Sequence, residues 1–300
     1  MIQLVFPEGK EKAFTASYDD GTIFDKDLIK LMNEYGIKGT FNLNSSLFGK
    51  EGRAVIDGYD TDISRIPEDE IVDLYCNHEI AAHAYTHMKL TESDFGMVSY
   101  EIIEDRKNLE RLSNRIIKGF AYPFGVYDDN VIQILKNCGI NYARTVENTR
   151  SFDIPKDFLR WHPTCHHNDA ELMNLAKTFC EENNIFGEAQ IFYLWGHSYE
   201  FSQKNNWQVI ENLFKYLHGY RDKIWMASNG EILDYMKRFN NLEYSADGKF
   251  VYNPSCEPVW IKNNGEIKST IIFNSFEVIL RPSLDDINSS LYFVSAILDL

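Results

Sequence analysis

Two neighbouring carboxylates, Asp19 and Asp20, are the first residues in the chain whose type and position could carry out chemistry. They follow an apolar, strand-like run over residues 13–16 and precede Gly21, which permits a tight turn. Adjacent carboxylates repel each other, so a solvated Asp-Asp-Gly turn is the ordinary interpretation. A bound cation would offset the repulsion, and one carboxylate could then hold a metal while the other handles protons.

His83 and His87 add possible nitrogen ligands. Their spacing of four residues places both side chains on one face of either a helix or a strand. Neutral imidazoles favour zinc and neighbouring first-row metals. The chain has eight histidines, so this pair indicates a metal site only in combination with the earlier Asp-Asp-Gly. Two histidines and one carboxylate also fit a non-haem iron oxygenase, but a second acid, Asp19, and the later His197 fit hydrolysis better.

The residues that could carry out chemistry follow segments that are predicted to be strands, and helical patterns lie between them. Such repeating units predict an α/β fold, a closed parallel sheet with its active-site loops at the carboxyl ends of the strands. The segment over residues 44–65 is glycine-rich and polar and is expected to be a long loop. Helices are expected over residues 25–35, 67–75, 97–112, 128–138, 169–182, 207–217 and 231–239. Strands are expected over residues 39–43, 79–82, 141–145, 158–162, 190–195 and 223–227, with a further strand ending at 121–122.

The pattern changes after residue 240. Residues 244–252 and 262–266 have the turn residues of hairpins between short strands. We therefore predict a barrel over residues 1–240 and a small β-rich appendage, packed on the barrel, over residues 241–300.

Four short segments carry a family resemblance: Ser-Tyr-Asp-Asp-Gly at 17–21, His-Ala-Tyr-Thr-His at 83–87, Ala-Tyr-Pro-Phe-Gly at 121–125 and Leu-Trp-Gly-His at 194–197. In this order they resemble the motifs of the polysaccharide deacetylase family, also called carbohydrate esterase family 4 or the NodB-homology domain. The resemblance extends from about residue 13 to about residue 237. It implies a distorted (β/α) barrel of about seven parallel strands.

The resemblance also implies roles for particular residues. Asp20, His83 and His87 correspond to the metal ligands, with zinc the expected ion and cobalt, nickel, manganese or iron(II) also possible. Asp19 corresponds to the general base and His197 to the general acid. The backbone amide of Phe124 corresponds to the donor that stabilises the oxyanion.

Two departures from the family pattern concern charge near the base. The arginine that pairs with the base in the family corresponds here to Ala121, and the fourth motif, with its Asp-Trp signature, is missing. We predict that Arg160 restores the positive charge by contacting Asp19, against the alternative that it is a solvent-exposed arginine. His162, His166 and His167 remain unassigned, with metal binding as one alternative.

Several side chains could bind substrate. Glu200 could bind a hydroxyl or an amine, or be a surface acid. Aromatic side chains could stack on sugar rings, and the candidates are Tyr85, Trp161, Trp195 and Tyr199.

The predicted function is metal-dependent hydrolysis of acetyl groups on an N-acetylated sugar or oligosaccharide. Hydrolysis of O-acetyl esters on xylan would use the same groups, and the superfamily also contains amide hydrolases for non-sugar substrates. An inactive glycan-binding barrel is the alternative outside the enzymes. The combination of base, acid and metal ligands argues against it, because binding alone needs neither an acid nor a base.

Composition limits the partners and the compartment. A formal net charge of −15 argues against nucleic acid and anionic membranes, both of which need a basic surface. The five cysteines form no Cys-x-x-Cys pattern, so reduced thiols are expected rather than a disulfide framework. The N-terminal residues lack the pattern of a signal peptide, and no apolar run approaches a membrane span. These features predict a cytoplasmic protein.

Overall fold

The central element is a curled parallel sheet. The computed structural model describes residues 2–182, 188–270 and 277–278. Seven strands follow one another in the order β8 (Tyr142–Arg144), β7 (Gly119–Ala121), β6 (Glu79–Ala82), β3 (Gly39–Leu43), β2 (Lys12–Asp19), β10 (Gln190–Gly196) and β9 (Cys165–His166). An eighth, β11 (Ile224–Met226), pairs with the first residues of β2. The prediction of a distorted barrel of about seven parallel strands is confirmed.

Strand β2 shows how the sequence builds this sheet. Alternate residues of a strand point to opposite faces. Phe14 and Tyr18 pack in the hydrophobic core under the helices. On the opposite face, Thr15 donates a hydrogen bond to Asn229 (2.8 Å), and Ser17 accepts one from Asn42 (2.7 Å). Asp19 belongs to this polar inner face, which is buried although it is not apolar.

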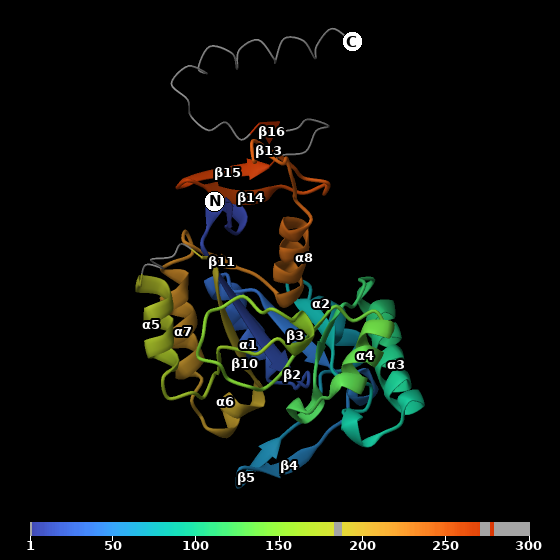
Figure 1. The fold of residues 1–300 in the computed structure, drawn as a ribbon. Helices are drawn as coiled ribbons and strands as arrows, with labels where there is room; N and C mark the ends of the chain where they lie inside the picture. Colours follow the sequence, from blue (N-terminus) through green and yellow to red (C-terminus); the bar gives the residue numbers. More distant parts are fainter. Residues whose placement is uncertain (1, 183–187, 271–276, 279–300) are drawn as a thin grey trace.

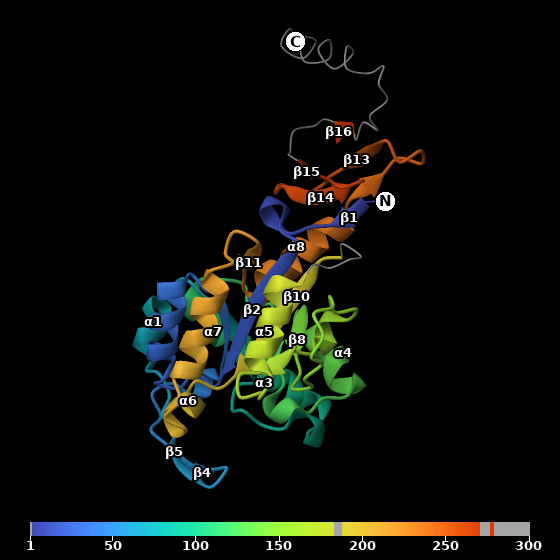
Figure 2. The same cartoon turned by 90° about the vertical axis from the view of Figure 1, so that its left-hand side faces the viewer.

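Helices cover the outer face of the sheet in two groups (Figures 1 and 2). Helix α1 begins and ends where the sequence predicts, buries Leu28, Ile29 and Met32, and ends at Gly36 in the left-handed conformation (φ 67°). The first group contains α1 (Asp25–Tyr35), α7 (Gln208–His218) and α5 (Leu172–Glu181). The second contains α3 (Phe95–Ser113) and α4 (Asp129–Asn137), and the remaining helices are α2 (Ile71–Leu74), α6 (Tyr199–Gln203) and α8 (Asn229–Asn240).

The expected long loop after β3 contains a hairpin. Strands β4 (Arg53–Ile56) and β5 (Tyr59–Asp62) are joined by Asp57 and Gly58, both with positive φ, as a two-residue Asp-Gly turn requires. The amide of Gln203 fixes the hairpin by donating to the carbonyl of Ile56 (2.9 Å). In Figure 1 the hairpin projects at the end of the barrel where β2 ends.

The strand predicted over residues 158–162 is wrong. The Asp157 side chain accepts a hydrogen bond from the Leu159 amide (2.9 Å) and thereby starts a 3-10 turn over Phe158–Arg160. The chain reaches the sheet only through a bridge between Trp161 and Arg144, and then through β9.

Short strands follow α8 in the described part of the appendage. One sheet has the order β1 (Ile2–Leu4), β14 (Val259–Asn263) and β15 (Glu266–Thr270), so its edge strand comes from the N-terminal segment that we had assigned to the barrel. The other contains β12 (Glu243–Tyr244), β13 (Phe250–Tyr252) and β16 (Glu277–Val278). The Tyr235 hydroxyl of α8 joins the two parts, since it donates to the Val5 carbonyl (2.7 Å) and accepts from the Trp260 amide (2.8 Å). The boundary at residue 240 stays a prediction, and part of the predicted appendage, residues 271–276 and 279–300, lies outside the described residues.

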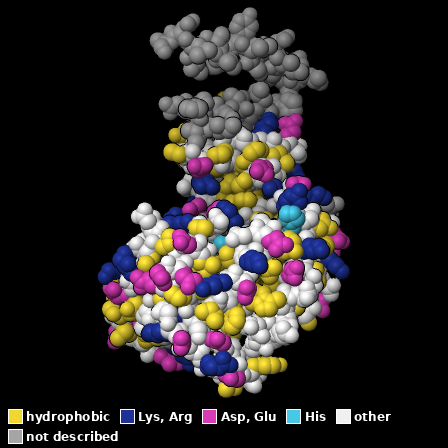
Figure 3. Space-filling view, turned by 180° about the vertical axis from the view of Figure 1, so that it is seen from behind, with side chains coloured by type: hydrophobic (Ala, Val, Ile, Leu, Met, Phe, Trp, Pro, Cys, Tyr) yellow, Lys and Arg dark blue, Asp and Glu magenta, His cyan; other side chains and the backbone are white. Residues whose placement is uncertain are grey.

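Charged side chains of both signs lie on the surface of the barrel. Figure 3 shows basic and acidic side chains interspersed over the visible face of the barrel. Among the described residues, no helix has the length and apolar character that crossing a membrane requires.

Candidate active site

The end of strand β2 places both aspartates at the inner edge of the sheet. Asp19 is its last residue, and the next two residues, Asp20 (φ 82°) and Gly21 (φ 63°), both turn through the left-handed region. A side chain at Gly21 would meet Leu43 at 2.8 Å, so this close turn requires glycine. Asp19 is only 3% exposed, and a carboxylate buried to this extent needs a charged partner.

The loop after β6 carries both histidines. The Nδ1 atom of His83 lies 2.8 Å from the Ala121 carbonyl, which can only accept, so Nδ1 carries the proton and Nε2 has a free lone pair. Buried Asp105 accepts a hydrogen bond from the His83 amide (3.0 Å) and fixes the start of the loop. The rings of His83 and His87 are 4.8 Å apart.

Asp20, His83 and His87 converge on one point. One possible ligand atom from each lies within 4.8 Å of the other two, and His87 Nε2 is 3.6 Å from Asp20 Oδ1. Burial lowers the pKa of both histidines, that of His87 to about 4, so both are neutral and can coordinate. Asp20 Oδ1 is buried and accepts no hydrogen bond within the described part of the chain, although Arg65 Nη1 lies 3.1 Å away. This donor set fits a divalent metal.

Replacing His83 with Ala is expected to remove the metal site while the fold is kept. The variant loses one of three ligands, so its zinc affinity should fall by more than the roughly 10–100-fold that is typical when a residue supporting a ligand is lost. Titration calorimetry with zinc measures this directly. An unchanged affinity and a full equivalent of bound zinc would show that the metal binds elsewhere.

Arg144, the last residue of β8, is the charged partner of Asp19. It is fully buried, and its guanidinium donates a hydrogen bond to Asp19 Oδ2, while Asn42 donates to Oδ1 (2.8 Å). Burial raises the pKa of Asp19, but the charges of Arg144, His83 and His197 outweigh it and hold the pKa below its usual value. Asp19 is therefore ionised at neutral pH. Arg144 also lies over the ring of Trp195, 4.5 Å from its centre.

The predicted contact between Arg160 and Asp19 is wrong. Arg160 lies in the 3-10 turn, and its guanidinium pairs with Asp157 and Asp129. Because the segment is a turn and not a strand end, its side chain points away from the base and is 36% exposed. A signal for Arg144 was present in the sequence, since this residue is the last but one in the strand predicted over 141–145 and is the last residue of β8.

His197 follows β10 and faces the base from the other side. Its Nε2 atom lies 4.0 Å from Asp19 Oδ2, and its Nδ1 atom lies 2.7 Å from Glu200 Oε1. Burial lowers the pKa of His197, but the hydrogen bond to Glu200 and the charges of Asp20 and Asp19 raise it above its usual value. The protonated form, which a general acid needs, is therefore favoured.

Phe124 lies at the entrance to the site in a strained turn. Its φ of 59° is rare for a non-glycine residue, and such strain occurs mainly at functional sites. Its ring is 57% exposed and lies 4.6 Å from the ring of His87. Its amide belongs to the first residues of the 3-10 helix Pro123–Gly125, where amides have no partner within the helix. The amide can therefore serve as a donor to substrate.

The proposed substrate-binding side chains differ in their positions. Trp161 is only 2% exposed and packs against Tyr142, Phe158 and Tyr193, so its prediction as a sugar-stacking residue is wrong. The oxygens of Glu200 are occupied by protein donors, which argues against the predicted role in binding a substrate hydroxyl or amine.

Three other aromatic candidates lie near the site. Tyr199 is 7% exposed, with its ring 5.1 Å from that of His197. Trp195 is partly exposed and donates from Nε1 to Asn148 (2.8 Å). Tyr85 is partly exposed, within two residues of both histidine ligands. His162, left unassigned from the sequence, bonds to Thr145 through Nδ1 (2.7 Å).

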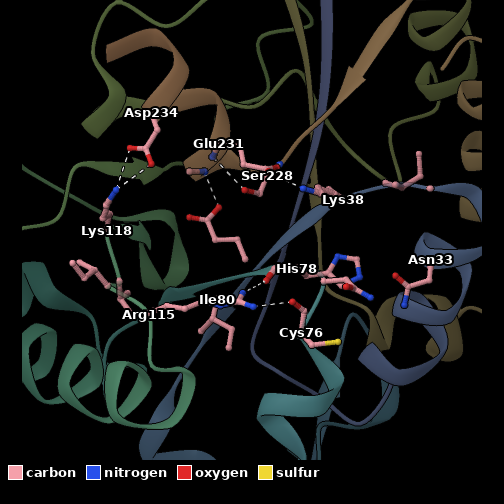
Figure 4. A pocket seen from close by; sticks show the side chains of 17 residues that line it. Asn33, Lys38, Cys76, His78, Ile80, Arg115, Lys118, Ser228, Glu231 and Asp234 are labelled. Carbon is pink, nitrogen blue, oxygen red and sulfur yellow. Dashed lines mark hydrogen bonds and ion pairs between the residues drawn. The ribbon is translucent and has the colours of Figure 1, made fainter. Parts of the chain in front are cut away.

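A separate cavity of about 610 Å³ lies where β3 and β6 begin, at the opposite end of these strands (Figure 4). It contains several basic side chains, but they are already paired. Lys38 contacts Glu231 (2.5 Å), and Lys118 contacts Asp234 (3.0 Å). Arg115 donates to the backbone carbonyls of His78 and Cys76. The charges of both lysines are neutralised by acids and Arg115 is held by the backbone, so the aspartate–histidine cluster remains the candidate active site.

Comparisons with known proteins show similarity to polysaccharide deacetylases in sequence and in fold. The family model of polysaccharide deacetylases matches residues 7–143. No curated protein sequence matches the chain. A Mycobacterium smegmatis protein assigned to the polysaccharide deacetylases has a TM-score of 0.57 at 14% identity, and the alignment covers 79% of this chain and 94% of that one. It shows that the two chains share a fold.

Two further structures are similar over different lengths. The Xyl-CE4 domain of a multidomain xylanase from the hindgut metagenome of Trinervitermes trinervoides has a TM-score of 0.49 at 18% identity, covering 79% of this chain and 98% of that one. A Streptococcus pyogenes deacetylase in complex with acetate has a TM-score of 0.38 at 17% identity, covering 44% of this chain and 55% of that one. The sequence match over residues 7–143 is thus to the polysaccharide deacetylase family, and the fold is shared with the Mycobacterium smegmatis protein over most of the chain.

Proposed function

We propose that the protein is a metal-dependent hydrolase that removes acetyl groups from an N-acetylated sugar or oligosaccharide. The observation that carries this proposal is the position of the Asp19 carboxylate, next to the Asp20–His83–His87 cluster and 4.0 Å from the Nε2 atom of His197. A binding module needs no such acid–base pair. The match of residues 7–143 to the polysaccharide deacetylase family supports a glycan substrate.

The metal would be held by Asp20, His83 and His87. A divalent ion, with zinc the expected one, supplies a Lewis acid for the acetyl carbonyl and lowers the pKa of water. Asp19 takes the proton from the attacking water, since Arg144 and Asn42 hold its carboxylate in place. His197 gives a proton from Nε2 to the leaving nitrogen, and the Phe124 amide donates a hydrogen bond to the acetyl oxygen as negative charge develops there.

Acetate release from a panel of acetylated compounds tests the proposal. We expect release from N-acetylated chito-oligosaccharides, loss of this activity after chelation, and recovery when zinc is added back. Release from acetylated xylan alone would change the substrate to an O-acetyl ester. Release only from non-sugar amides would show that the substrate is not a glycan. Binding of glycan without any acetate release would identify a non-catalytic barrel.

A further inference from the structure

Glu200, three residues after His197, is the centre of a buried cluster of hydrogen-bond donors. Its Oε1 atom lies 2.7 Å from His197 Nδ1 and 3.3 Å from His166 Nε2. Its Oε2 atom lies 3.3 Å from His167 Nε2 and accepts a hydrogen bond from the Asn168 side chain. His197 and the Asn168 side chain therefore hydrogen-bond to the carboxylate, and two further imidazole nitrogens lie 3.3 Å from it without a well-directed hydrogen bond.

A hydrogen bond from Asn168, two residues further along the chain, determines which nitrogen of the His166 ring carries the proton. The Asn168 backbone amide donates a hydrogen bond to His166 Nδ1 (3.1 Å). An atom that accepts a hydrogen bond cannot carry the proton, so the proton of the neutral ring is on Nε2 and points to Glu200.

His167 is enclosed by aromatic rings and has one charged neighbour. It is fully buried between Tyr18 (ring distance 5.7 Å, nearly parallel) and Phe201 (4.1 Å). Burial lowers its pKa to about 3, so the ring is neutral and faces Glu200 with Nε2. A side chain at Gly196 would lie 2.1 Å from His167 Nδ1, so the glycine before His197 makes room for this imidazole. The Leu-Trp-Gly-His segment therefore contributes His197 to the active site and, through Gly196, the space that His167 occupies beside Glu200.

The donors keep Glu200 in its ionised form. Burial raises its pKa, but the imidazoles of His166, His167 and His197 hold the pKa far below its usual range. A carboxylate whose pKa is this low stays ionised and leaves the Nδ1 proton on His197. The only proton that His197 can release is the one on Nε2, which faces Asp19.

We propose that Glu200 is a positioning residue for the general acid His197, and that His166 and His167 keep Glu200 ionised and in place. This inference rests on the proposed function, because it concerns the acid of that reaction. The anion that supports the acid comes from the same turn as the acid itself.

A second metal ion in the cluster is the main alternative. The possible ligand atoms of His166, His167 and Glu200 also lie within 4.8 Å of one another. A histidine that binds a metal through Nε2 usually donates its other N–H to an acceptor. At His166 this other nitrogen faces a backbone N–H instead, so the Nε2 lone pair that a metal needs is not available.

The variant Glu200→Gln tests the positioning role, because the side chain keeps its size and loses its charge. We expect hydrolysis of an N-acetyl sugar, whose nitrogen must be protonated to leave, to fall by roughly 10²-fold, within the range for acid–base catalysis. Hydrolysis of nitrophenyl acetate should change little, because nitrophenolate leaves without a proton. An equal loss with both substrates would indicate a structural role and overturn the proposal.

The pKa of the His197 ring, measured by NMR on the intact protein, gives a readout that needs no substrate. The charged groups facing His197 are Glu200 on its own turn and Asp19 and Asp20 at the end of β2. Removing the charge of Glu200 should lower the His197 pKa, so the basic limb of the pH–rate profile should move to lower pH. An unchanged His197 pKa would overturn the proposal even if the substrate were different from the one proposed above.

Lys204 provides the matched control. Its Nζ lies 3.9 Å from Glu200 Oε2 on the same short helix, beyond hydrogen-bond distance. Lys204→Met should behave as the wild type with both substrates.

Measuring the zinc content tests the alternative of a second metal ion in the cluster. Two equivalents of zinc in the wild type and one in Glu200→Gln would show a second metal and overturn the proposal. Absence of acetate release from the wild type, with a lowered His197 pKa in Glu200→Gln, would contradict the proposed function and leave the positioning role intact.

Discussion

Asp19→Asn is expected to bind one equivalent of metal and to lose most of its activity, by about 10²–10⁴-fold, the usual contribution of a general acid or base. The amide is nearly the same size as the carboxylate, so the hydrogen bond from Asn42 and the ligand set of Asp20, His83 and His87 can remain. It cannot take a proton from water. Acetate release and zinc content, measured on the same preparation, separate this loss from loss of the metal.

Two further variants make the result specific. Asp20→Asn should lose both metal and activity, because Asp20 is one of the three proposed ligands. Asp69→Asn makes the same chemical change at an exposed position and should have no effect. Turnover by Asp19→Asn at the wild-type rate would show that Asp19 is not the general base.

The residues of the site that could be predicted from the sequence are those that end a strand or directly follow one. Asp19 ends β2, and the histidines follow β6, its neighbour but one in the sheet. The carboxyl ends of parallel strands meet at one edge, so these two segments, which are far apart in the chain, had to converge. The helix over residues 25–35 was predictable for a similar reason. Its apolar residues recur at helical spacing and a glycine ends it.

Arg144 and Arg160 show why the charge partner of the base could not be chosen from the sequence. Both arginines come late in segments with a strand-like pattern, and the sequence alone does not tell a strand from a single turn in so short a segment. The deciding interaction is the side chain of Asp157, which accepts from the Leu159 amide and starts a 3-10 turn. The turn directs Arg160 to the surface, whereas Arg144 remains in the sheet and points inward.

The cluster around Glu200 was missed for another reason. His166 and His167 lie more than thirty positions before Glu200 in the chain. Strands β9 and β10, which are parallel neighbours in the sheet, bring them together. The sequence contains a signal in Gly196, but its meaning depends on the imidazole that fills the space of the absent side chain. Such close contacts between elements can be found only after the pairing of the strands is known.

Arg144→Met is expected to move the acidic limb of the pH–rate profile upward by about 1–3 pH units, the usual effect of an arginine on a neighbouring aspartate. In the wild type, the charge of Arg144 opposes the effect of burial and keeps the pKa of Asp19 low. Without that charge, burial raises the Asp19 pKa. The base is then protonated over a wider pH range, and the pH dependence of kcat/KM for acetate release measures the shift.

The same change should reduce stability in a pH-dependent way. A carboxylate with a lowered pKa in the folded protein stabilises the fold above its unfolded pKa, and this contribution is lost as the pH falls through the folded value. Arg144→Met lacks the contribution, so its deficit in unfolding free energy should be largest near neutral pH and smaller in acid. Breaking a buried ion pair costs about 3–5 kcal/mol, and chemical denaturation at several pH values checks both the size and the direction of the effect.

Arg160→Met is the matched control, because it removes the same charge from an arginine that pairs only with Asp157 and Asp129 at the surface. Exposed ion pairs contribute about 0–1 kcal/mol, so this variant should unfold and hydrolyse like the wild type. Zinc content should stay at one equivalent in both variants, since neither arginine supplies a ligand. If the profile of Arg144→Met overlays that of Arg160→Met, Arg144 does not set the charge of the base. Asp19 would then have to be kept ionised by the metal site alone.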